Sequence, residues 1–168
     1  MKNRTGILTL CALLLASVPA LAQHFPWQSS ASSNAASHQL VRFLFPQQVE
    51  IQAGKPAVID LHFQIEPGLH INSHVPNQRS LIRTELIRTT TPGLKISSVE
   101  FPAGASYAFA AAPTVKLSVY TGELDVKVHV DAQRGDHLFQ GSLRYQACDM
   151  NTCFPPRNVP VAVDVIAN

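Results

Sequence analysis

The stretch Ala57-Val58-Ile59-Asp60-Leu61-His62-Phe63-Gln64-Ile65 decides the fold class of this chain. Apolar and polar side chains alternate along it, and successive side chains of an extended chain point to opposite faces. One face is therefore apolar, while the other carries Asp60, His62 and Gln64. This period of two predicts a strand in a sheet that has one buried face and one solvated face.

The same period recurs on both sides of this strand, and turn residues such as Pro92-Gly93 separate the alternating segments. Residues 81–88 fit either one helical turn or a strand, and their context favours a strand. Residues 102–113 are rich in alanine and glycine without a period, which predicts a long irregular loop. Pro160 places the last strand at a sheet edge. Further strands are predicted at 41–45, 49–51, 69–73, 94–101, 115–119, 124–130, 143–147 and 159–165.

These short strands, without a convincing helix between them, predict an all-β chain folded as an antiparallel β-sandwich. The N-terminal residues have the features of a secretory signal peptide, because Lys2 and Arg4 precede an apolar run that ends at the small residues Ala20-Leu21-Ala22. The predicted parts are a signal peptide, a disordered leader and one folded domain, at residues 1–22, 23–38 and 39–168.

Removal of the signal peptide would change the charge of the chain. The signal carries two of the 13 basic residues and none of the 11 acidic ones, so eleven of each remain. No block of Lys and Arg is left, which argues against nucleic acid and anionic membrane surfaces as partners. No later segment is apolar for long enough to span a bilayer. Export places the remaining chain in an oxidising compartment, where disulfides persist.

Two of the three cysteines lie beyond the signal peptide, and only four residues separate Cys148 from Cys153. A disulfide that closes about six residues stabilises a fold by only ~2 kcal/mol, against nearly 5 for a loop of about 100 residues. Stabilisation of the fold is therefore a weak explanation for a disulfide at this place. A short disulfide within a loop suits redox activity instead. Against that, Asp149 would raise the pKa of a neighbouring thiol, and the loop holds no Lys or His to activate a thiolate. The residues alone leave a redox-active and a structural disulfide equally open.

The motif Tyr145-Gln146-Ala147-Cys148, followed by Cys153-Phe154-Pro155-Pro156, resembles the active-site segment of the N-terminal domain of DsbD, the transmembrane thiol:disulfide interchange protein. Gly68-Leu69-His70-Ile71-Asn72 resembles the start of an earlier strand in that domain, and the similarity extends over residues 41–165. This resemblance implies an immunoglobulin-like antiparallel β-sandwich in the periplasm, with secretion as the alternative location.

The resemblance also implies a function, namely thiol-disulfide exchange through Cys148 and Cys153 with no further cofactor. Such a module relays reducing equivalents from a thioredoxin-like protein or a DsbD-type membrane donor to periplasmic acceptors, as a component of a protein-disulfide reductase system. By analogy, Cys153 is the attacking thiol, and we expect a monomer. The residues expected to cap or flank the pair are Tyr107, Phe109, His70, Asn72, Tyr145 and Phe154. The alternative is a non-catalytic immunoglobulin-like interaction module with a structural loop disulfide.

The chain departs from better-known members of that family in three respects. Those members have five residues between the cysteines, acidic residues in the cap loop, and membrane and thioredoxin-like domains attached. Here the spacing is four, residues 104–113 hold no acid, and the donor is expected to be a separate protein. His70 and His74 lack a nearby Cys or carboxylate cluster, so we expect no metal. We expect His70 and Asn72 to flank the cysteine loop and to tune a thiol pKa.

Overall fold

The structure is a computed structural model that describes residues 39–45, 48–109 and 112–168. The signal peptide and leader predicted for residues 1–38 lie outside these ranges. Every regular element of the described residues is a strand, which confirms the all-β prediction, and no helix there is long and apolar enough to cross a membrane. The strands are β1 (Val41–Phe45), β2 (Gln48–Ile51), β3 (Ala57–Ile65), β4 (His70–Asn72), β5 (Glu85–Arg88), β6 (Leu94–Glu100), β7 (Ala105–Phe109), β8 (Ala112–Tyr120), β9 (Glu123–Ala132), β10 (Gly135–Tyr145), β11 (Ala147–Cys148) and β12 (Arg157–Ala167).

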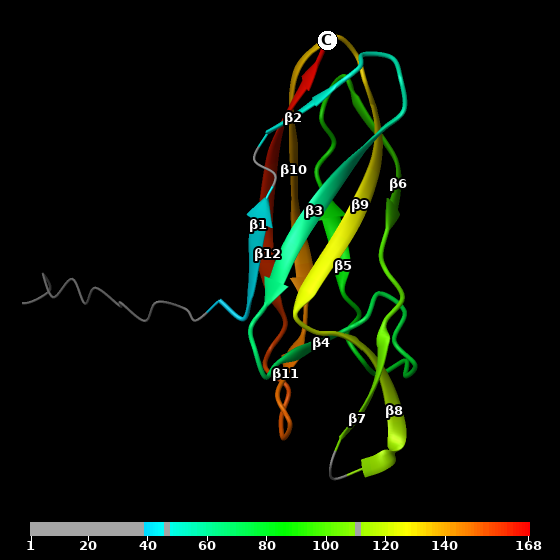
Figure 1. Cartoon of the computed structure of the whole chain (residues 1–168), viewed down its shortest axis with the longest axis vertical. Helices are drawn as coiled ribbons and strands as arrows, with labels where there is room; N and C mark the ends of the chain where they lie inside the picture. The colour runs from blue at the N-terminus through cyan, green and yellow to red at the C-terminus, as the bar shows by residue number, and fades with distance from the viewer. Residues whose placement is uncertain (1–38, 46–47, 110–111) are drawn as a thin grey trace, which may run out of the picture. The chain divides into compact units, whose positions relative to one another are not determined.

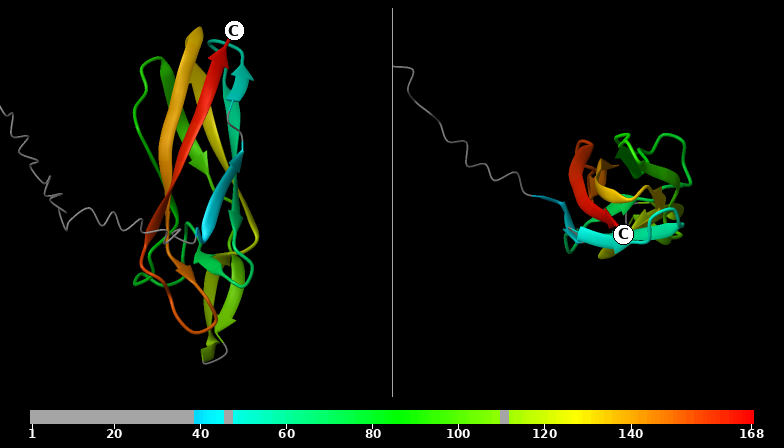
Figure 2. Two further views of the ribbon diagram at one scale, coloured as in Figure 1. Left: turned by 90° about the vertical axis from the view of Figure 1, so that its left-hand side faces the viewer. Right: turned by 90° about the horizontal axis from the view of Figure 1, so that it is seen from above.

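The strands form three sheets of four strands each. The sheet with the order β1-β3-β9-β6 and the sheet with the order β2-β12-β10-β5 lie face to face around a common core (Figures 1 and 2). The third sheet, β11-β4-β8-β7, lies at the end of the sandwich opposite to the C-terminus (Figure 1). Neighbouring strands pair antiparallel except β12 and β2, which are parallel. The domain is an immunoglobulin-like β-sandwich.

The alternating residues of β3 fill the core, as the sequence predicts. Ile59, Leu61 and Phe63 are at most 1% exposed, and their partners across β9 are apolar as well. The facing sheet contributes Phe139 and Leu143 from β10 and a row of buried valines from β12. Full burial of one such side chain stabilises the fold by about 1.5–3 kcal/mol, so the two inner faces together hold the sandwich closed.

The third sheet joins this core through β4, a strand of three residues that is buried on both faces. Ile71 points into the sandwich core together with its partners Tyr120 on β8 and Ala147 on β11. Because side chains alternate along a strand, the residues on either side of Ile71 point the other way.

That opposite face of the third sheet is a second buried layer, which we call the site face. It consists of His70 and Asn72 on β4, Cys148 on β11, and Leu117 and Val119 on β8, all at most 3% exposed. Packing of Ile71 in the sandwich core therefore fixes which side chains line the site face.

The prediction of an irregular loop over residues 102–113 is wrong. Ala105–Phe109 forms β7, and β8 begins at Ala112, so the segment enters a β-hairpin. The apolar period is missing because β7 lies at the edge of its sheet, where none of its side chains is fully buried. Backbone pairing with β8, rather than burial of an apolar row, makes this segment a strand.

Two other predictions are settled by the pairing. Residues 85–88 form β5, which confirms a strand rather than a helical turn in that region. The edge position predicted from Pro160 is wrong for the strand as a whole, because β12 lies between β10 and β2. However, β2 pairs with β12 only at residues 164–167, so the proline stands outside that pairing.

Leu143 and Leu138 lie on β10, the first fully buried in the core and the second 39% exposed. We expect Leu143→Ala to lower the free energy of unfolding by about 2–5 kcal/mol, because it leaves a cavity. The matched change Leu138→Ala should cost less than about 1 kcal/mol. Urea unfolding of both variants measures the difference, and equal losses would contradict this arrangement of the core.

Candidate functional site

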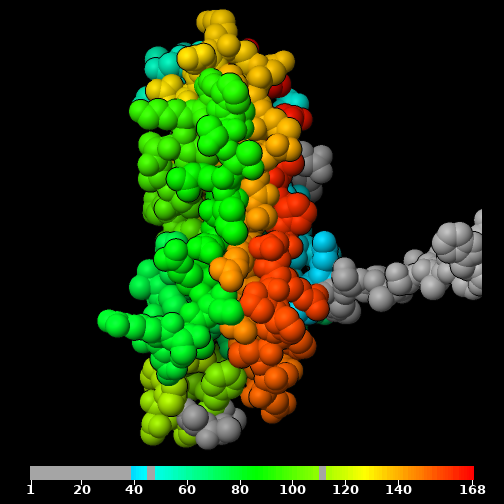
Figure 3. All heavy atoms as spheres, turned by 180° about the vertical axis from the view of Figure 1, so that it is seen from behind, coloured from blue at the N-terminus to red at the C-terminus, as the bar shows by residue number. Residues whose placement is uncertain are grey.

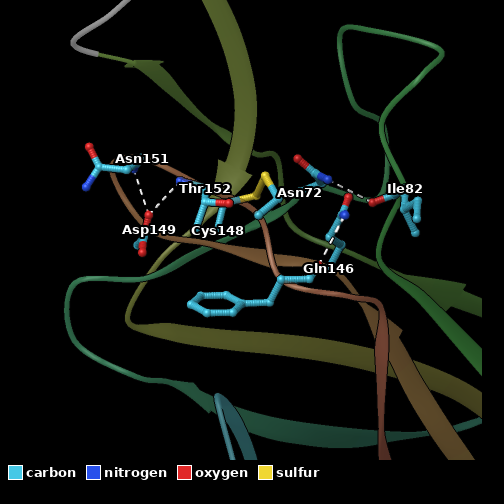
Figure 4. The surroundings of a disulfide bond; sticks show 9 residues. Asn72, Ile82, Gln146, Cys148, Asp149, Asn151 and Thr152 are labelled. Carbon is cyan, nitrogen blue, oxygen red and sulfur yellow. Dashed lines mark hydrogen bonds between the residues drawn. A yellow bond between two sulfur atoms is a disulfide. The ribbon is translucent and has the colours of Figure 1, made fainter.

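Cys148 and Cys153 are joined by a disulfide, with an S–S distance of 2.04 Å and Cα atoms 3.9 Å apart (Figure 4). The two residues face each other as an antiparallel pair. The backbone amide of Asp149 donates to the carbonyl of Thr152 at 2.9 Å, and the amide of Phe154 donates to the carbonyl of Ala147 at 2.8 Å. These bonds flank the cysteines, which therefore occupy a non-hydrogen-bonded position, where side chains of paired strands come closest. The cysteine loop is a small β-hairpin.

The turn of this hairpin is held by Asp149. Its carboxylate oxygen Oδ1 accepts hydrogen bonds from the backbone amides of Asn151 and Thr152, each at 2.7 Å (Figure 4). These two bonds, led by the one from Asn151, hold the pKa of the Asp149 carboxyl below its ordinary value of 3.8. An aspartate that accepts from amides two and three residues on is a common way to fix a turn. The ionised carboxylate thus orders the loop between the cysteines.

The two halves of the disulfide differ sharply in their access to solvent. Cys148 is 1% exposed and lies on the site face, whereas Cys153 is exposed. A partner thiolate must approach along the S–S axis of the sulfur that it attacks, and Cys153 is the residue of the pair that is exposed to solvent.

His70 lies directly opposite Cys148 in the pairing of β4 with β11. Its ring centroid is 4.2 Å from that of Tyr107 and 5.7 Å from that of Phe109 on β7. Burial lowers the pKa of the imidazole below 6.5, and the nearby Asp149 carboxylate opposes this in part, so His70 is neutral at pH 7. Its Nε2 atom is buried and has no hydrogen-bond partner among the described residues. The structure thus gathers His70, Tyr107 and Phe109 beside the buried half of the disulfide.

Two amide side chains brace the surroundings of the hairpin. Asn72 Nδ2 donates to the carbonyl of Ile82 at 3.0 Å, and its Oδ1 is a second buried atom of the site face without a partner in the described structure. Gln146 Nε2 donates to the carbonyl of Phe154 at 3.2 Å, which ties the strand after Cys153 to the strand before Cys148 (Figure 4). The sequence identified Gln146 only as part of a motif. Its bracing role depends on the return of the hairpin.

The other two residues that the sequence predicts to flank the pair, Tyr145 and Phe154, belong to the sandwich core or pack against it. Tyr145 is 2% exposed within the sandwich core, where burial raises the pKa of its hydroxyl, and Phe154 packs half-buried against the same core. Their part in flanking the redox pair stays a prediction.

His74 lies in different surroundings from His70. Its ring stacks on Phe101 with centroids 4.3 Å apart, and its Nδ1 is 2.9 Å from the carbonyl oxygen of Thr84. No cluster of three or more His, Cys, Asp or Glu side chains that could hold a metal ion occurs in residues 39–45, 48–109 and 112–168.

These features define a class of protein, namely an immunoglobulin-like β-sandwich that carries, at one end, a short-loop disulfide between a buried and an exposed cysteine. A family model for the N-terminal part of the thiol:disulfide interchange protein DsbD matches residues 41–164, and the chain belongs to this family of thiol-disulfide exchange modules.

The chain is similar to several solved structures, two of which are as follows. The reduced N-terminal domain of Neisseria meningitidis DsbD shares 15% identity over 66% of this chain and 79% of that one, with a TM-score of 0.41. The N-terminal periplasmic domain of Proteus mirabilis ScsB shares 16% identity over 68% of this chain, which spans 43% of that structure, with a TM-score of 0.49. Among curated proteins, no relative matches the chain.

The pKa of Asp149 leads to a pH prediction for the hairpin. Because the folded pKa lies below the ordinary 3.8, the carboxylate stabilises the turn above that value and loses this effect as the pH falls through the folded pKa. We expect the amide NMR signals of Asn151 and Thr152 to shift with a midpoint below 3.8. Asp149→Ala should abolish this transition, whereas Asp60→Ala on β3 should leave it unchanged. A midpoint at or above the ordinary value would contradict the hydrogen-bonded turn.

Proposed function

We propose that this protein relays reducing equivalents between other proteins through Cys148 and Cys153. The observation that carries the proposal is the asymmetry of the disulfide, which joins buried Cys148 to exposed Cys153, in a chain of the DsbD N-terminal family. The donor would be a thioredoxin-like protein or a DsbD-type membrane protein, and the acceptors would be periplasmic proteins. The protein itself would act in the periplasm as a monomer after removal of its signal peptide.

The exchange follows from which sulfur a partner can reach. A donor thiolate attacks the Sγ atom of Cys153, the Cys148–Cys153 bond breaks, and its electron pair leaves on Cys148, which takes up a proton. The second thiol of the donor then attacks the mixed disulfide as a thiolate and releases Cys153. In the opposite direction, the Cys153 thiolate attacks an acceptor disulfide, and Cys148 resolves the mixed disulfide. Two electrons and two protons are transferred in each full exchange.

The place of the hairpin also favours partner access. In Figure 3 the orange atoms of the hairpin segment form one tip of the domain, beside the yellow-green atoms of β7 and β8. Met150, in the turn between the cysteines, is 66% exposed. A disulfide at a protruding tip can enter the active-site groove of a thioredoxin-like protein without rearrangement of the sandwich.

We assign the cap role to Tyr107 and Phe109 on β7. Their rings lie 5.7 Å apart, and both contact the ring of His70, which lies opposite Cys148. The cap would thus cover the buried sulfur rather than the exposed one. It would slow attack by small thiols and premature oxidation of reduced Cys148 while leaving Cys153 open to partners.

Replacement of each cysteine separates their roles. With Cys148→Ser, the Cys153 thiolate should displace thionitrobenzoate from a thioredoxin-like protein whose single remaining cysteine carries that group as a mixed disulfide, and so form a stable protein–protein disulfide. With Cys153→Ser, trapping should fall to background, because the remaining thiol is buried. Non-reducing electrophoresis and mass spectrometry measure the adducts. Equal trapping by both variants would contradict the assignment of Cys153 as the attacking thiol.

The reduction potential decides between the relay and the structural alternative. For a relay, we expect a potential of roughly −270 to −120 mV, measured by alkylation across glutathione buffers. A value well below about −300 mV, together with no trapped adduct, would mark a structural disulfide and an interaction module instead.

The cap has its own test in the reduced protein. Tyr107→Ala combined with Phe109→Ala should expose Cys148 and raise its rate of alkylation severalfold, while the rate at Cys153 stays the same. Tyr120→Phe, which alters a buried tyrosine outside the site face, serves as the control. Unchanged alkylation of Cys148 in the double variant would remove the cap from the proposal.

A further inference from the structure

The site face contains an unmet hydrogen-bonding group beside the redox pair. His70 Nε2 is buried and has no partner in the described residues, on a side chain that is 2% exposed. A polar atom in the interior without a hydrogen bond destabilises the state of the protein that contains it. The state described here is the oxidised one, because the cysteines form a disulfide. The orphaned nitrogen is thus a feature of the oxidised protein.

The pairing of β4 with β11 brings this imidazole to Cys148. The two residues are direct partners in the register, and both are buried on the site face. Directly opposed side chains on one face of an antiparallel pair have Cβ atoms about 4.5–5.5 Å apart, which is within reach of an imidazole. The rings of Tyr107 and Phe109 lie against the imidazole from the β7 side, and the His70 side chain is buried.

We propose that His70 is the hydrogen-bond partner of the Cys148 sulfur in the reduced protein and that this bond raises the reduction potential of the pair. The proposal rests on the redox function proposed above. It concerns the buried cysteine, and it makes His70 a positioning residue that acts on the leaving group rather than on the partner protein.

The chemistry of the sulfur explains why this bond depends on the redox state. A disulfide sulfur carries no proton and is at best a weak acceptor, whereas a thiol has an S–H donor and a thiolate is a strong acceptor. A neutral imidazole can accept at its bare nitrogen or donate from its protonated nitrogen. When the Cys148–Cys153 bond breaks, the Cys148 thiolate can accept from Nε2–H, or the Cys148 thiol can donate to bare Nε2. In either tautomer, His70 Nε2 gains a hydrogen-bond partner only after reduction. The hydrogen bond therefore favours the reduced form of the cysteine pair.

The charge state of His70 fits this role. Burial holds its pKa low, and the charged group that acts on it is Asp149 of the hairpin, which offsets the effect only in part. Tyr107 of β7 is the titratable side chain in contact with the ring. The imidazole is therefore neutral at pH 7, with one ring nitrogen that can donate a hydrogen bond and one that can accept.

The test compares His70→Phe with the matched variant His74→Phe. Phenylalanine keeps an aromatic ring against Tyr107 and Phe109 but removes both nitrogens. We expect His70→Phe to shift the equilibrium with glutathione toward the disulfide about tenfold, which lowers the potential by about 30 mV for a two-electron couple. His74→Phe replaces a histidine that also stacks on an aromatic ring but is not the strand partner of Cys148, and it should leave the potential unchanged. His70→Gln, which restores an amide donor and acceptor, should recover part of the loss.

A second measurement keeps the proposal falsifiable if His70→Phe fails to fold. In the wild-type protein, the ¹⁵N NMR signal of His70 Nε2 should move on reduction as its hydrogen bond forms, while the signals of His74 should not. An unchanged potential in His70→Phe, or an Nε2 signal that does not respond to reduction, would overturn the inference.

These failures are distinct from failure of the relay. If the wild-type pair exchanges with glutathione and traps partners but His70→Phe matches it, only the role of His70 is lost. If the wild-type pair neither equilibrates with glutathione nor traps a partner, the proposed function is lost and the inference with it.

Discussion

The pairing of β11 with β4 is the constraint on which the site depends. It joins only two residue pairs, Ala147 with Ile71 and Cys148 with His70. Since side chains alternate along a strand, the first pair must enter the sandwich core when the second lies on the site face. A slip of β11 by one residue would turn Cys148 into the apolar core and Ala147 onto the site face, so Cys148 would no longer lie opposite His70. The hydrophobic core thus sets the register that buries one cysteine.

The hairpin leaves the second cysteine, Cys153, exposed. After Cys148 the chain turns at once, because Asp149 accepts two backbone amides, and the return strand carries Cys153 at the exposed side. Gln146 then fixes this return strand through the carbonyl of Phe154. A bond that closes so few residues stabilises the fold weakly, by ~2 kcal/mol, so its reduction need not disturb the sandwich. Weak stabilisation and unequal exposure both suit the reversible exchange proposed for this disulfide.

Local patterns in the sequence predicted the parts of the structure that local forces determine. The alternation of residues 57–65 identified β3 and its buried face, and the spacing of Cys148 and Cys153 identified the candidate site. The strand β7 was missed, since an edge strand buries no apolar row and gains its structure from β8. Local sequence patterns could not predict that His70 contacts Tyr107 or that it lies opposite Cys148. Both arise from pairings between segments that are distant in sequence. Register across a sheet is set by the whole core, and no local motif contains it.

The aromatic rings of β7 lie against His70, and this changes what a cap can do in this protein. A cover over the exposed sulfur would have to open before every exchange. Here Tyr107 and Phe109 contact the imidazole that opposes buried Cys148, so in the proposed exchange attack at Cys153 would need no movement of β7. In the proposed exchange, charge would develop on Cys148, which is 1% exposed, as the disulfide breaks. In such a dry site a single hydrogen bond to sulfur carries more weight than it would in water, because the effective dielectric constant is lower. An edge strand without an apolar pattern can therefore influence the energetics of a bond that it does not itself contain.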